Sequence, residues 1–567
     1  MQCHGGVGLV VAFAAALCVG CDEQVLSDMA IAVGIDEPGR APAPGRRTIP
    51  QAIAPLVGPS SPLRARLREF AAELARRRVE REAQQAAATA AAAGPPAVFD
   101  GAALDAEIRK IVAPLERRAD VSVHIRELAS DDVLFDYRGD APLNPASNNK
   151  LLTTAAALDL LGPEFRFETR ALQHGDALHV VGEGDPTIDH LALRSLADDI
   201  AAQVDRAAPR RIVVDDLAFS PRTLAPGFSD VGPGVSYQAP SGALSLDFNT
   251  VQVSVRAPKA RPRRGEVARL TVELHPPSTH LVVDDQATVG RGVLTVRTYA
   301  GMPVDGQART VVELTGKLRG GRSLSVRRRV VDPGLYTGGA LAMLLSEGTG
   351  APPLSVTRGP APAPEDQPRV VGRRESPPLR QVVGGALTWS NNFIAEQLLR
   401  TLGWRMTGNP GDWDNGAEVV QAYWEALGLP AASLVFENGS GFSQRGRVTT
   451  TALVDLISVA NRVQGQDGLL SALPVAGADG TLRARLRRSG KRVRAKTGTM
   501  AGVSGLSGVI TSEDGVPQVA FSIISNVREG GSGAAAQRKR AEDRIVMAML
   551  KALDAWALQR SQAGAAR

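Results

Sequence analysis

A long stretch of β-like sequence divides this 567-residue chain, and it constrains the fold more than any other feature. From about Phe167 to Gly372, short apolar runs are separated by Pro, Gly and Arg. Helical spacing precedes this stretch at residues 151–160 and returns at residues 379–399. Because the sequence pattern changes from helical to strand-like and back again, the sequence predicts one domain that is interrupted by a β-rich insertion and then resumes.

The predicted elements support this organisation. Outside the insertion we expect helices at 104–115, 417–427 and 534–558, and strands at 121–128, 133–137, 504–511 and 516–526. Within it we expect strands at 177–181, 212–214, 251–255, 270–274, 294–299, 309–314 and 324–331. The Pro- and charge-rich residues 355–376 are typical of a domain boundary or a surface loop. The predicted insertion therefore spans 168–371, between the two parts of a split domain at 97–167 and 372–560, and a short tail follows at 561–567.

The N-terminal residues carry a different signal. An apolar run from Val7 to Val19 is too short to cross a bilayer as a stable helix, but it has the length of a signal-peptide core. Residues 1–21 are therefore interpreted as a signal peptide, and Leu17 to Cys21 resembles a bacterial lipobox. Residues 22–96 are predicted to form a linker and a charged helical stalk. These features predict export to the periplasm and leave open whether Cys21 is lipidated.

Composition excludes several classes of function. The net charge of +6 is small for this length and does not indicate binding to nucleic acid. The cysteines are all within the first 21 residues, at Cys3, Cys18 and Cys21, so the body has no disulfide and no thiolate metal site. The sequence has no H-E-x-x-H and no G-x-x-x-x-G-K-[ST] motif, which argues against a zinc peptidase and an NTPase. We predict neither a metal nor another cofactor.

Three short motifs carry the chemical signal. Ser147-Asn148-Asn149-Lys150 is an S-x-x-K at the start of a helix, Ser390-Asn391-Asn392 is an S-x-N after a helical segment, and Lys496-Thr497-Gly498 is a K-T-G on a strand-like run. Each alone is weak, because a serine before a helix is usually an N-cap. Together they are specific, since S-x-x-K and K-T-G each occur once in a chain with only eight lysines.

The choice of lysine at these positions indicates a base. The chain meets nearly all its need for positive charge with arginine, which stays protonated, whereas an ammonium can lose its proton when it is buried or placed near another cation. Ser147 and Lys150 are one helical turn apart, so a neutral Lys150 could take the proton of Ser147. We expect Lys496 to depress the pKa of Lys150 and to attract a substrate carboxylate.

The remaining motif residues complete a predicted acyl-transfer site. Ser390 would pass a proton to the leaving amine, and Asn392 would orient the substrate amide or Lys150. The backbone N–H groups of Ser147 and Thr499 would form the oxyanion hole. A Ser-His-Asp hydrolase is disfavoured, because no G-x-S-x-G motif occurs and all seven histidines lie outside the three motifs.

The same motifs resemble those of penicillin-binding proteins. The chain is most similar to the D-alanyl-D-alanine carboxypeptidase/endopeptidase family of low-molecular-mass penicillin-binding proteins, over roughly residues 99–558. Beyond the motifs, four further segments carry the resemblance: Gly182-Glu183-Gly184-Asp185-Pro186, Tyr237-Gln238-Ala239-Pro240, Asn438-Gly439-Ser440-Gly441 and Gly480-Thr481-Leu482. The long insertion between the first two motifs is a mark of the family. The chain departs from many relatives at Asn391 and Asn438, where they carry Asp.

The resemblance implies an α+β fold, in which a transpeptidase-like domain with an antiparallel sheet flanked by helices carries the inserted β-rich region. It implies a serine enzyme that cleaves D-Ala-D-Ala in peptidoglycan stem peptides through an acyl-enzyme and is inhibited covalently by β-lactams. It also implies that Thr497, Gly498 and Thr499 bind substrate. A noncatalytic cell-wall scaffold of the same fold and, less favoured, a β-lactamase remain as alternatives. The sequence leaves open whether carboxypeptidase or endopeptidase action dominates, the stem-peptide preference and homodimer formation.

Overall fold

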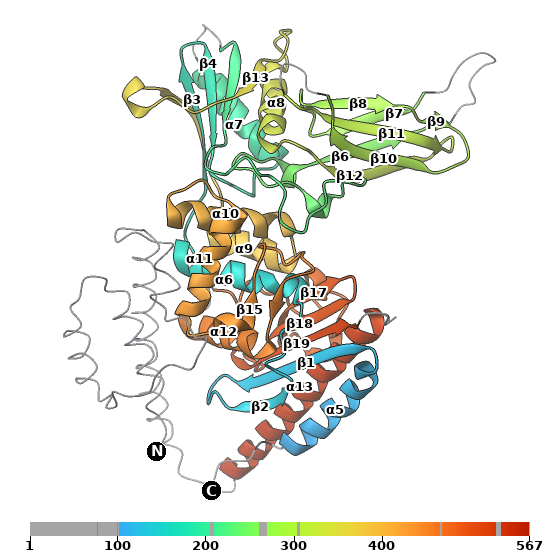
Figure 1. Ribbon diagram of the computed structural model, residues 1–567, viewed down its shortest axis with the longest axis vertical. Helices are drawn as coiled ribbons and strands as arrows, with labels where there is room; N and C mark the ends of the chain where they lie inside the picture. Colours follow the sequence, from blue (N-terminus) through green and yellow to red (C-terminus); the bar gives the residue numbers. More distant parts are fainter. Residues whose placement is uncertain are drawn as a thin grey trace.

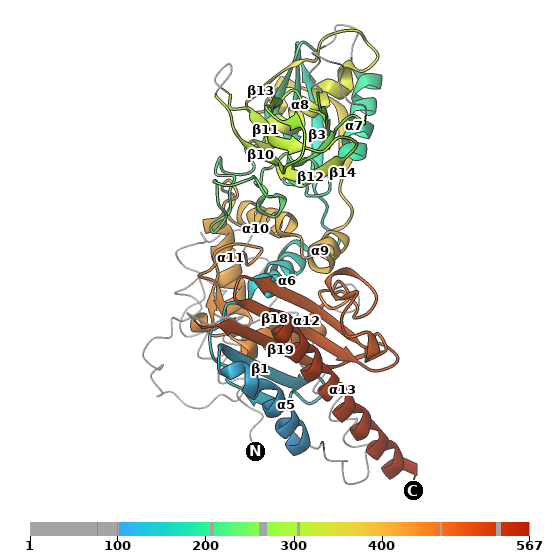
Figure 2. The same ribbon diagram turned by 90° about the vertical axis from the view of Figure 1, so that its right-hand side faces the viewer.

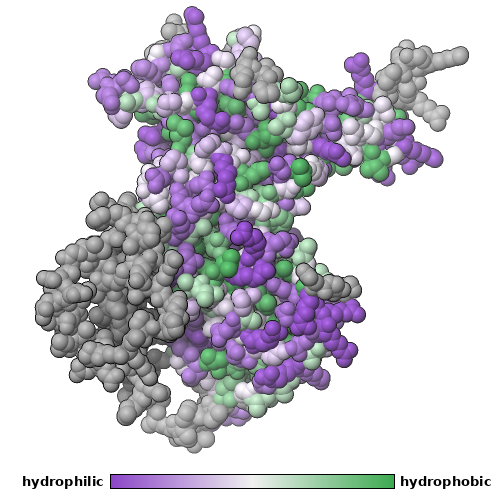
Figure 3. All heavy atoms as spheres, viewed as in Figure 1, coloured by the Kyte–Doolittle hydropathy of each residue, from purple (hydrophilic) through white to green (hydrophobic). Residues whose placement is uncertain are grey.

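The computed structural model describes residues 76, 99, 101–204, 209–259, 269–302, 307–464, 468–528 and 535–565. The predicted signal peptide and lipobox lie outside the described residues, as does all but Arg76 of the predicted linker and stalk. The described part folds into two units that are joined at a waist, which is visible in the ribbon diagram and on the space-filling surface (Figures 1 and 3). None of its helices is long and apolar enough to cross a membrane.

The lower unit is built on a five-stranded sheet in the order β17-β18-β19-β1-β2, with every neighbouring pair antiparallel. Its strands come from the two ends of the described chain: β1 (Ala119–Glu127), β2 (Val133–Tyr137), β17 (Val493–Met500), β18 (Val503–Thr511) and β19 (Pro517–Val527). Segments before and after the insertion therefore share one sheet (Figure 2). The predicted antiparallel sheet flanked by helices is confirmed.

Helices cover both faces of this sheet, which is why β18 is buried along its whole length. On one face, α5 (Gly101–Glu116) and α13 (Ala535–Ala565) enclose a core that includes Val123 and Ile523. On the other face lie α6 (Lys150–Leu161), α9 (Leu379–Thr388), α10 (Asn392–Thr407), α11 (Trp413–Ala426) and α12 (Thr450–Val463). Ile524, one residue after Ile523, belongs to this second core, as the period of two in a strand requires.

Two predictions about helices need correction. The expected continuous helix 379–399 is two helices, because Ser390 has a φ of +55° and the Asn391 side chain accepts a hydrogen bond from the N–H of Ile394 to cap α10. The C-terminal helix α13 continues to Ala565, beyond the expected 558 and into the predicted tail. Ile545, Met549 and Leu553, which helical spacing places on one stripe with Trp556, are buried, and the partly buried Trp556 packs edge-on against Phe99.

The upper unit holds three sheets around one core (Figure 1). The first has the order β13-β5-β4-β3-β14, the second β10-β11-β8 with β9 beside β11, and the third β12-β6-β7. Their bounds are β3 (Glu168–His174), β4 (Ala177–Gly182), β5 (Arg211–Asp215), β6 (Thr250–Arg256), β7 (Thr271–His275), β8 (Leu281–Asp285), β9 (Thr288–Val289), β10 (Leu294–Ala300), β11 (Thr310–Leu318), β12 (Ser323–Arg329), β13 (Ser355–Arg358) and β14 (Arg369–Glu375). Each of the seven runs predicted as strands corresponds to one of these strands.

The insertion also contains elements that the sequence patterns did not predict. Two helices, α7 (His190–Gln203) and α8 (Pro333–Ser346), begin at the N-caps Asp189 and Asp332. The predicted surface loop 355–376 is wrong, since it supplies β13 and β14, and β14 runs past the expected limit of 371. Both are edge strands of the first sheet. Edge strands tolerate Pro and charge, so their composition resembles that of a loop.

Short elements complete the fold. β15 (Leu434–Val435) pairs with β16 (Arg447–Val448). The 3₁₀ turns are η1 (Ala146–Asn149), η2 (Ser236–Gln238), η3 (Asp247–Asn249), η4 (Pro364–Asp366), η5 (Ala431–Ser433), η7 (Gly480–Leu482) and η8 (Arg487–Ser489). Of these, η1 leads directly into α6, and η2 belongs to the segment of the insertion that lies against α10.

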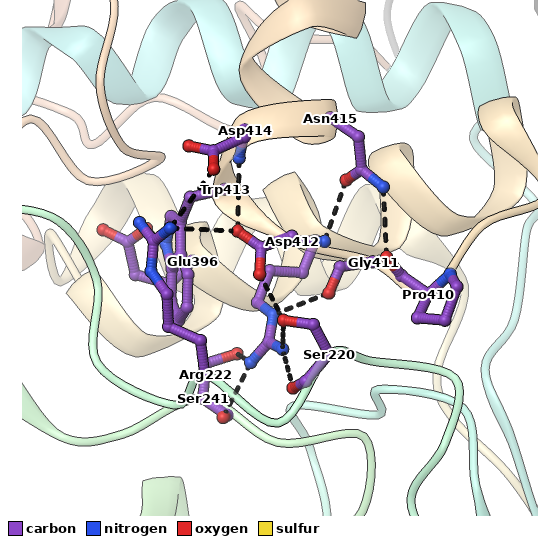
Figure 4. A network of polar contacts seen from close by, with 11 residues as sticks. Ser220, Arg222, Ser241, Glu396, Pro410, Gly411, Asp412, Trp413, Asp414 and Asn415 are labelled. Carbon is purple, nitrogen blue, oxygen red and sulfur yellow. Dashed lines mark hydrogen bonds and ion pairs between the residues drawn. The ribbon is translucent and has the colours of Figure 1, made fainter.

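A buried polar network joins the two units (Figure 4). Arg400 of α10 lies between the rings of Phe219 and Trp413, 4.5 Å from each ring centre. Its guanidinium donates to the carbonyls of Ser220 at 2.6 Å, Ser241 at 2.8 Å and Gly411 at 3.1 Å. Burial lowers the pKa of Arg400 to about 9, so it is still a cation at neutral pH. The insertion is thus held to α10 by charge-assisted hydrogen bonds.

Candidate active site

Ser147 lies in the 3₁₀ turn η1, immediately before α6. This turn is fixed by its neighbours: the Asn144 side chain accepts from the N–H of Ala146 at 2.9 Å, and the Asn149 side chain donates to the carbonyl of Asn438 at 2.8 Å. Lys150 is the first residue of α6, and its Nζ donates to Ser147 Oγ at 3.0 Å. The two polar atoms of the S-x-x-K motif are therefore in direct contact.

The ammonium group of Lys150 is fully buried and has two further acceptors. It donates to Asn392 Oδ1 at 2.8 Å and to the carbonyl of Ser440 at 2.9 Å. Burial lowers the pKa of Lys150 to about 7, against the opposing effect of the Glu396 carboxylate. At neutral pH a substantial fraction of Lys150 is therefore neutral and able to accept a proton.

Ser390 and Lys496 form a second pair. Lys496 Nζ donates to Ser390 Oγ at 2.8 Å and to the carbonyl of Thr497 at 2.6 Å. Burial lowers the pKa of Lys496 well below its ordinary value, and the charge of Lys150 lowers it further. All three motifs thus converge, although they lie on η1 with α6, on the break between α9 and α10, and on β17.

The charge coupling between the two lysines differs from the prediction in one respect. We expected Lys496 to lower the pKa of Lys150, but burial accounts for the lowered pKa of Lys150, and the repulsion acts on Lys496. Two ammonium groups that lie close together repel each other, so the lysine that is protonated second has its pKa lowered by the first. The pKa of Lys150 is therefore lowered by burial, and that of Lys496 by burial first and by the charge of Lys150 second.

The K-T-G motif lies along β17, an edge strand of the five-stranded sheet. Thr497 Oγ1 donates to Thr481 Oγ1 at 2.8 Å, while Thr499 is exposed. A Cβ placed on Gly498 would lie 2.6 Å from the carbonyl oxygen of Pro145. Glycine is needed here because β17 packs directly against the η1 turn that carries Ser147.

Sequence reasoning missed several groups of the site. Asn392 donates to the carbonyl of Tyr237 at 2.9 Å, which brings the insertion to the site. The carbonyl of Ser440 belongs to the segment Asn438-Gly439-Ser440-Gly441, which carried the resemblance but had no predicted role. Glu396 was not considered, although it lies four residues after Asn392 on one helix and therefore on the same face. That spacing was the signal that could have found it.

Comparison with known proteins agrees with this geometry. The chain matches the D-Ala-D-Ala carboxypeptidase 3 (S13) family over residues 104–549. It is 31% identical over 437 residues to a D-alanyl-D-alanine carboxypeptidase of Actinomadura sp. (strain R39), covering 73% of this chain and 79% of that protein. It is 23% identical over 431 residues to the D-alanyl-D-alanine carboxypeptidase DacB of Haemophilus influenzae, covering 73% and 87%.

The fold agrees as well. The crystal structure of penicillin binding protein 4 (dacB) from Haemophilus influenzae matches with a TM-score of 0.63 at 21% identity, over 78% of this chain and 99% of that chain. A second structure of that protein holds a novel β-lactam. The family match spans all three motifs and both parts of the split sheet. The chain therefore belongs to the D-Ala-D-Ala carboxypeptidase 3 (S13) family and is a serine-type D-Ala-D-Ala carboxypeptidase.

Proposed function

We propose that Ser147 is the nucleophile of this carboxypeptidase and that Lys150 is its general base. The observation that carries the proposal is the 3.0 Å hydrogen bond between a fully buried Lys150 Nζ and Ser147 Oγ. Ser147 Oγ attacks the carbonyl carbon of the penultimate D-Ala while its proton passes to Lys150, and the carbonyl electron pair moves to the oxygen. The backbone N–H groups of Ser147 and Thr499 receive that oxyanion.

Collapse of the tetrahedral intermediate breaks the peptide bond and releases D-Ala. We assign proton delivery to the leaving amine to Ser390, which receives a hydrogen bond from Lys496. The proton that Lys150 took from Ser147 replaces the one that Ser390 gives up, so Lys150 is neutral again. Water then hydrolyses the ester between Ser147 and the stem peptide: Lys150 takes a proton from the water and returns it to Ser147 Oγ as the ester bond breaks. Asn392 orients Lys150 through its side-chain oxygen, and it also contacts the Tyr237 carbonyl of the insertion.

Thr497, Gly498 and Thr499 are proposed to bind the peptide substrate along β17. An exposed sheet edge can pair with an extended peptide through main-chain hydrogen bonds. The terminal carboxylate of the substrate would then lie near Lys496. The negative charge would restore the ammonium form of Lys496, whose pKa is lowered in the free site. Peptidoglycan stem peptides, which end in a free carboxylate, fit this arrangement.

We further propose that β-lactams acylate Ser147, and this reaction supplies the test. The purified enzyme is incubated with a fluorescent penicillin, and the labelled peptide is sequenced by mass spectrometry. Label on the peptide that contains Ser147 is expected. Absence of label, or label on another residue, would contradict the proposal, and absence would favour the noncatalytic scaffold. Rapid turnover of the label would favour a β-lactamase.

The modular organisation and location are also proposals. Residues 97–167 and 372–560 form the catalytic domain, and 168–371 form an inserted domain. The chain acts in the periplasm after cleavage immediately before Cys21, with a lipid on Cys21 as its membrane attachment. Intact-mass measurement of the protein from a membrane fraction distinguishes a lipidated chain that begins at Cys21 from a chain without the diacylglyceryl group or one that retains Met1.

A further inference from the structure

A buried carboxylate lies behind the proposed base. Glu396 is on α10, one turn after Asn392, and is only 1% exposed. Three N–H groups donate to its carboxylate: Trp413 Nε1 at 2.8 Å, the backbone of Gly439 at 2.9 Å and the backbone of Ser440 at 2.9 Å. An ionised carboxylate accepts hydrogen bonds and donates none, so this set of donors matches the charged form. Figure 4 shows Glu396 beside Trp413.

The segment that Glu396 holds is the turn 438–441, and the other side of this turn faces α6. Three consecutive carbonyls of the turn accept from η1 and α6: Asn438 from Asn149 Nδ2 at 2.8 Å, Gly439 from Thr153 Oγ1 at 2.8 Å and Ser440 from Lys150 Nζ at 2.9 Å. The carboxylate and the base thus lie on opposite sides of the same turn. Each peptide unit of the turn that donates to Glu396 also carries a carbonyl that is bound by Asn149 at the end of η1 or by Thr153 of α6.

We propose that Glu396 is a positioning residue for Lys150, which fixes the turn 438–441 against α6 and supplies a buried counter-charge for the protonated base. The inference rests on the proposed role of Lys150. When Lys150 takes the proton of Ser147, it becomes a cation in a fully buried site beside Lys496. A buried cation without an anionic partner is strongly unfavourable. The carboxylate of Glu396 offsets that cost and makes the proton transfer attainable.

The other groups that contact Lys150 supply no negative charge, so Glu396 is the counter-charge for the protonated base. Ser147 on η1, Asn392 on α10 and the Ser440 carbonyl are neutral, and Lys496 on β17 is a second amine, which offers no negative charge. Among the described residues, Glu396 is the one anion that acts on the pKa of Lys150, and it raises that pKa against burial. Removing the Glu396 carboxylate therefore lowers the pH at which Lys150 becomes neutral. It also destabilises the protonated Lys150 that forms when Ser147 attacks the substrate.

The test is the pH dependence of acylation by a fluorescent penicillin, measured for the wild type, Glu396→Gln and Glu396→Asp. Acylation rises with pH as Lys150 loses its proton. In Glu396→Gln we expect this rise to move to lower pH by about one unit, because an opposite charge has been removed. We also expect the plateau rate to fall roughly 10–100-fold, because the turn loses an acceptor and shifts. Glu396→Asp keeps the charge and should show a smaller shift of the same sign.

Glu542→Gln is the matched control. Glu542 is a buried glutamate on α13, on the opposite face of the sheet, and it pairs with Arg485 and Ser504. The same substitution there should leave the pH of the rise unchanged. A lowered plateau in Glu396→Gln with the rise at the wild-type pH would mean a purely structural role and would overturn the inference.

Two further results of these experiments also decide the role of Glu396. If Glu396→Gln does not fold, Glu396→Met, which also removes the charge, decides in its place: a rise at lower pH supports the counter-charge, and an unmoved rise contradicts it. Wild-type acylation by Lys150→Arg would overturn the proposed function together with this inference. An inactive Lys150→Arg beside an unmoved rise in Glu396→Gln would overturn the inference alone.

Discussion

At the scale of single residues, the site depends on two buried lysines whose pKa values are lowered for the same reason. Lys150 and Lys496 are both fully buried, and desolvation disfavours the charged form of each. Arginine could not replace either one as a proton acceptor. The chain is rich in arginine, and the two positions where the site retains lysine are therefore the positions that the fold buries.

The first prediction concerns the base. Lys150→Arg keeps the charge but cannot accept the proton of Ser147, so acylation should fall by about 10²–10⁴-fold, the usual contribution of general-base catalysis. Ser147→Ala should abolish labelling while changing the free energy of unfolding by no more than about 1 kcal/mol. Stopped-flow fluorescence with each variant measures the rates, and near-wild-type acylation in Lys150→Arg would exclude Lys150.

The second prediction concerns pH. Because Lys150 acts in its neutral form and its pKa is lowered to about 7, acylation of the free enzyme should rise with pH through about 7. The same shift affects stability. The unfolded chain, with an ordinary lysine pKa near 10.4, binds more protons than the folded state between about pH 7 and 10. This group therefore makes the protein more stable as pH rises through that window, and denaturant titrations of wild type against Lys150→Met should show the difference.

The third prediction concerns Lys496. Removal of this amine in Lys496→Ala should weaken capture of substrates that carry a terminal carboxylate, and the loss should be smaller for substrates without one. Comparing the acylation rates for a matched pair of acid and amide substrates measures this difference. An equal loss for both would show that Lys496 does not recognise the carboxylate.

At the scale of elements, α10 organises the site. One helix provides Asn392 to Lys150, Glu396 to the turn 438–441 and Arg400 to the insertion. These residues are spaced by four, so they form one stripe along the helix. A shift of α10 would move all three contacts together, which ties the docking of the insertion to the geometry of the base.

The fourth prediction tests the turn that faces α6. Gly441 has a φ of +75°, and a Cβ there would overlap the carbonyl oxygen of Ala146, next to Ser147. Gly441→Ala should lower the free energy of unfolding by about 1–3 kcal/mol and slow acylation, because η1 must move. The control is Gly384→Ala on α9, where a Cβ meets nothing within 4 Å and helix propensity favours alanine. If both variants behave alike, close packing of the turn on η1 is not required.

At the scale of the whole molecule, the two units are linked through a few buried polar groups. Arg400 donates to three carbonyls from different segments. Loss of such a residue leaves acceptors buried without donors, which costs far more than loss of a surface ion pair.

The fifth prediction follows from that difference. Arg400→Met should lower the free energy of unfolding by about 3–5 kcal/mol and increase proteolysis between the units. Arg194→Met, which removes an exposed ion pair with Glu347, should cost less than about 1 kcal/mol. Urea denaturation and limited proteolysis of the two variants test this, and comparable losses would show that Arg400 does not hold the units together.

The sequence alone determined the parts of this protein that depend on local pattern and residue type. Apolar runs predicted β1, β18 and β19, which are buried on both faces of the sheet, and helical spacing predicted α13, which buries one face. Side-chain chemistry pointed to Ser147 and Lys150, since an i to i+3 spacing brings them together wherever the helix lies.

Only the tertiary structure decided what depends on contacts distant in sequence. Residues 355–376 appear loop-like because an edge strand exposes much of its surface. The spacing of four residues places Glu396 on the same face of α10 as Asn392, but it acquires its role only because the turn 438–441 folds between it and Lys150. The pKa of Lys150 likewise depends on burial, which arises when α6, α10 and β17 pack around one amine. Burial and charge pairing are properties of the assembled fold, so no local pattern in the chain reports them.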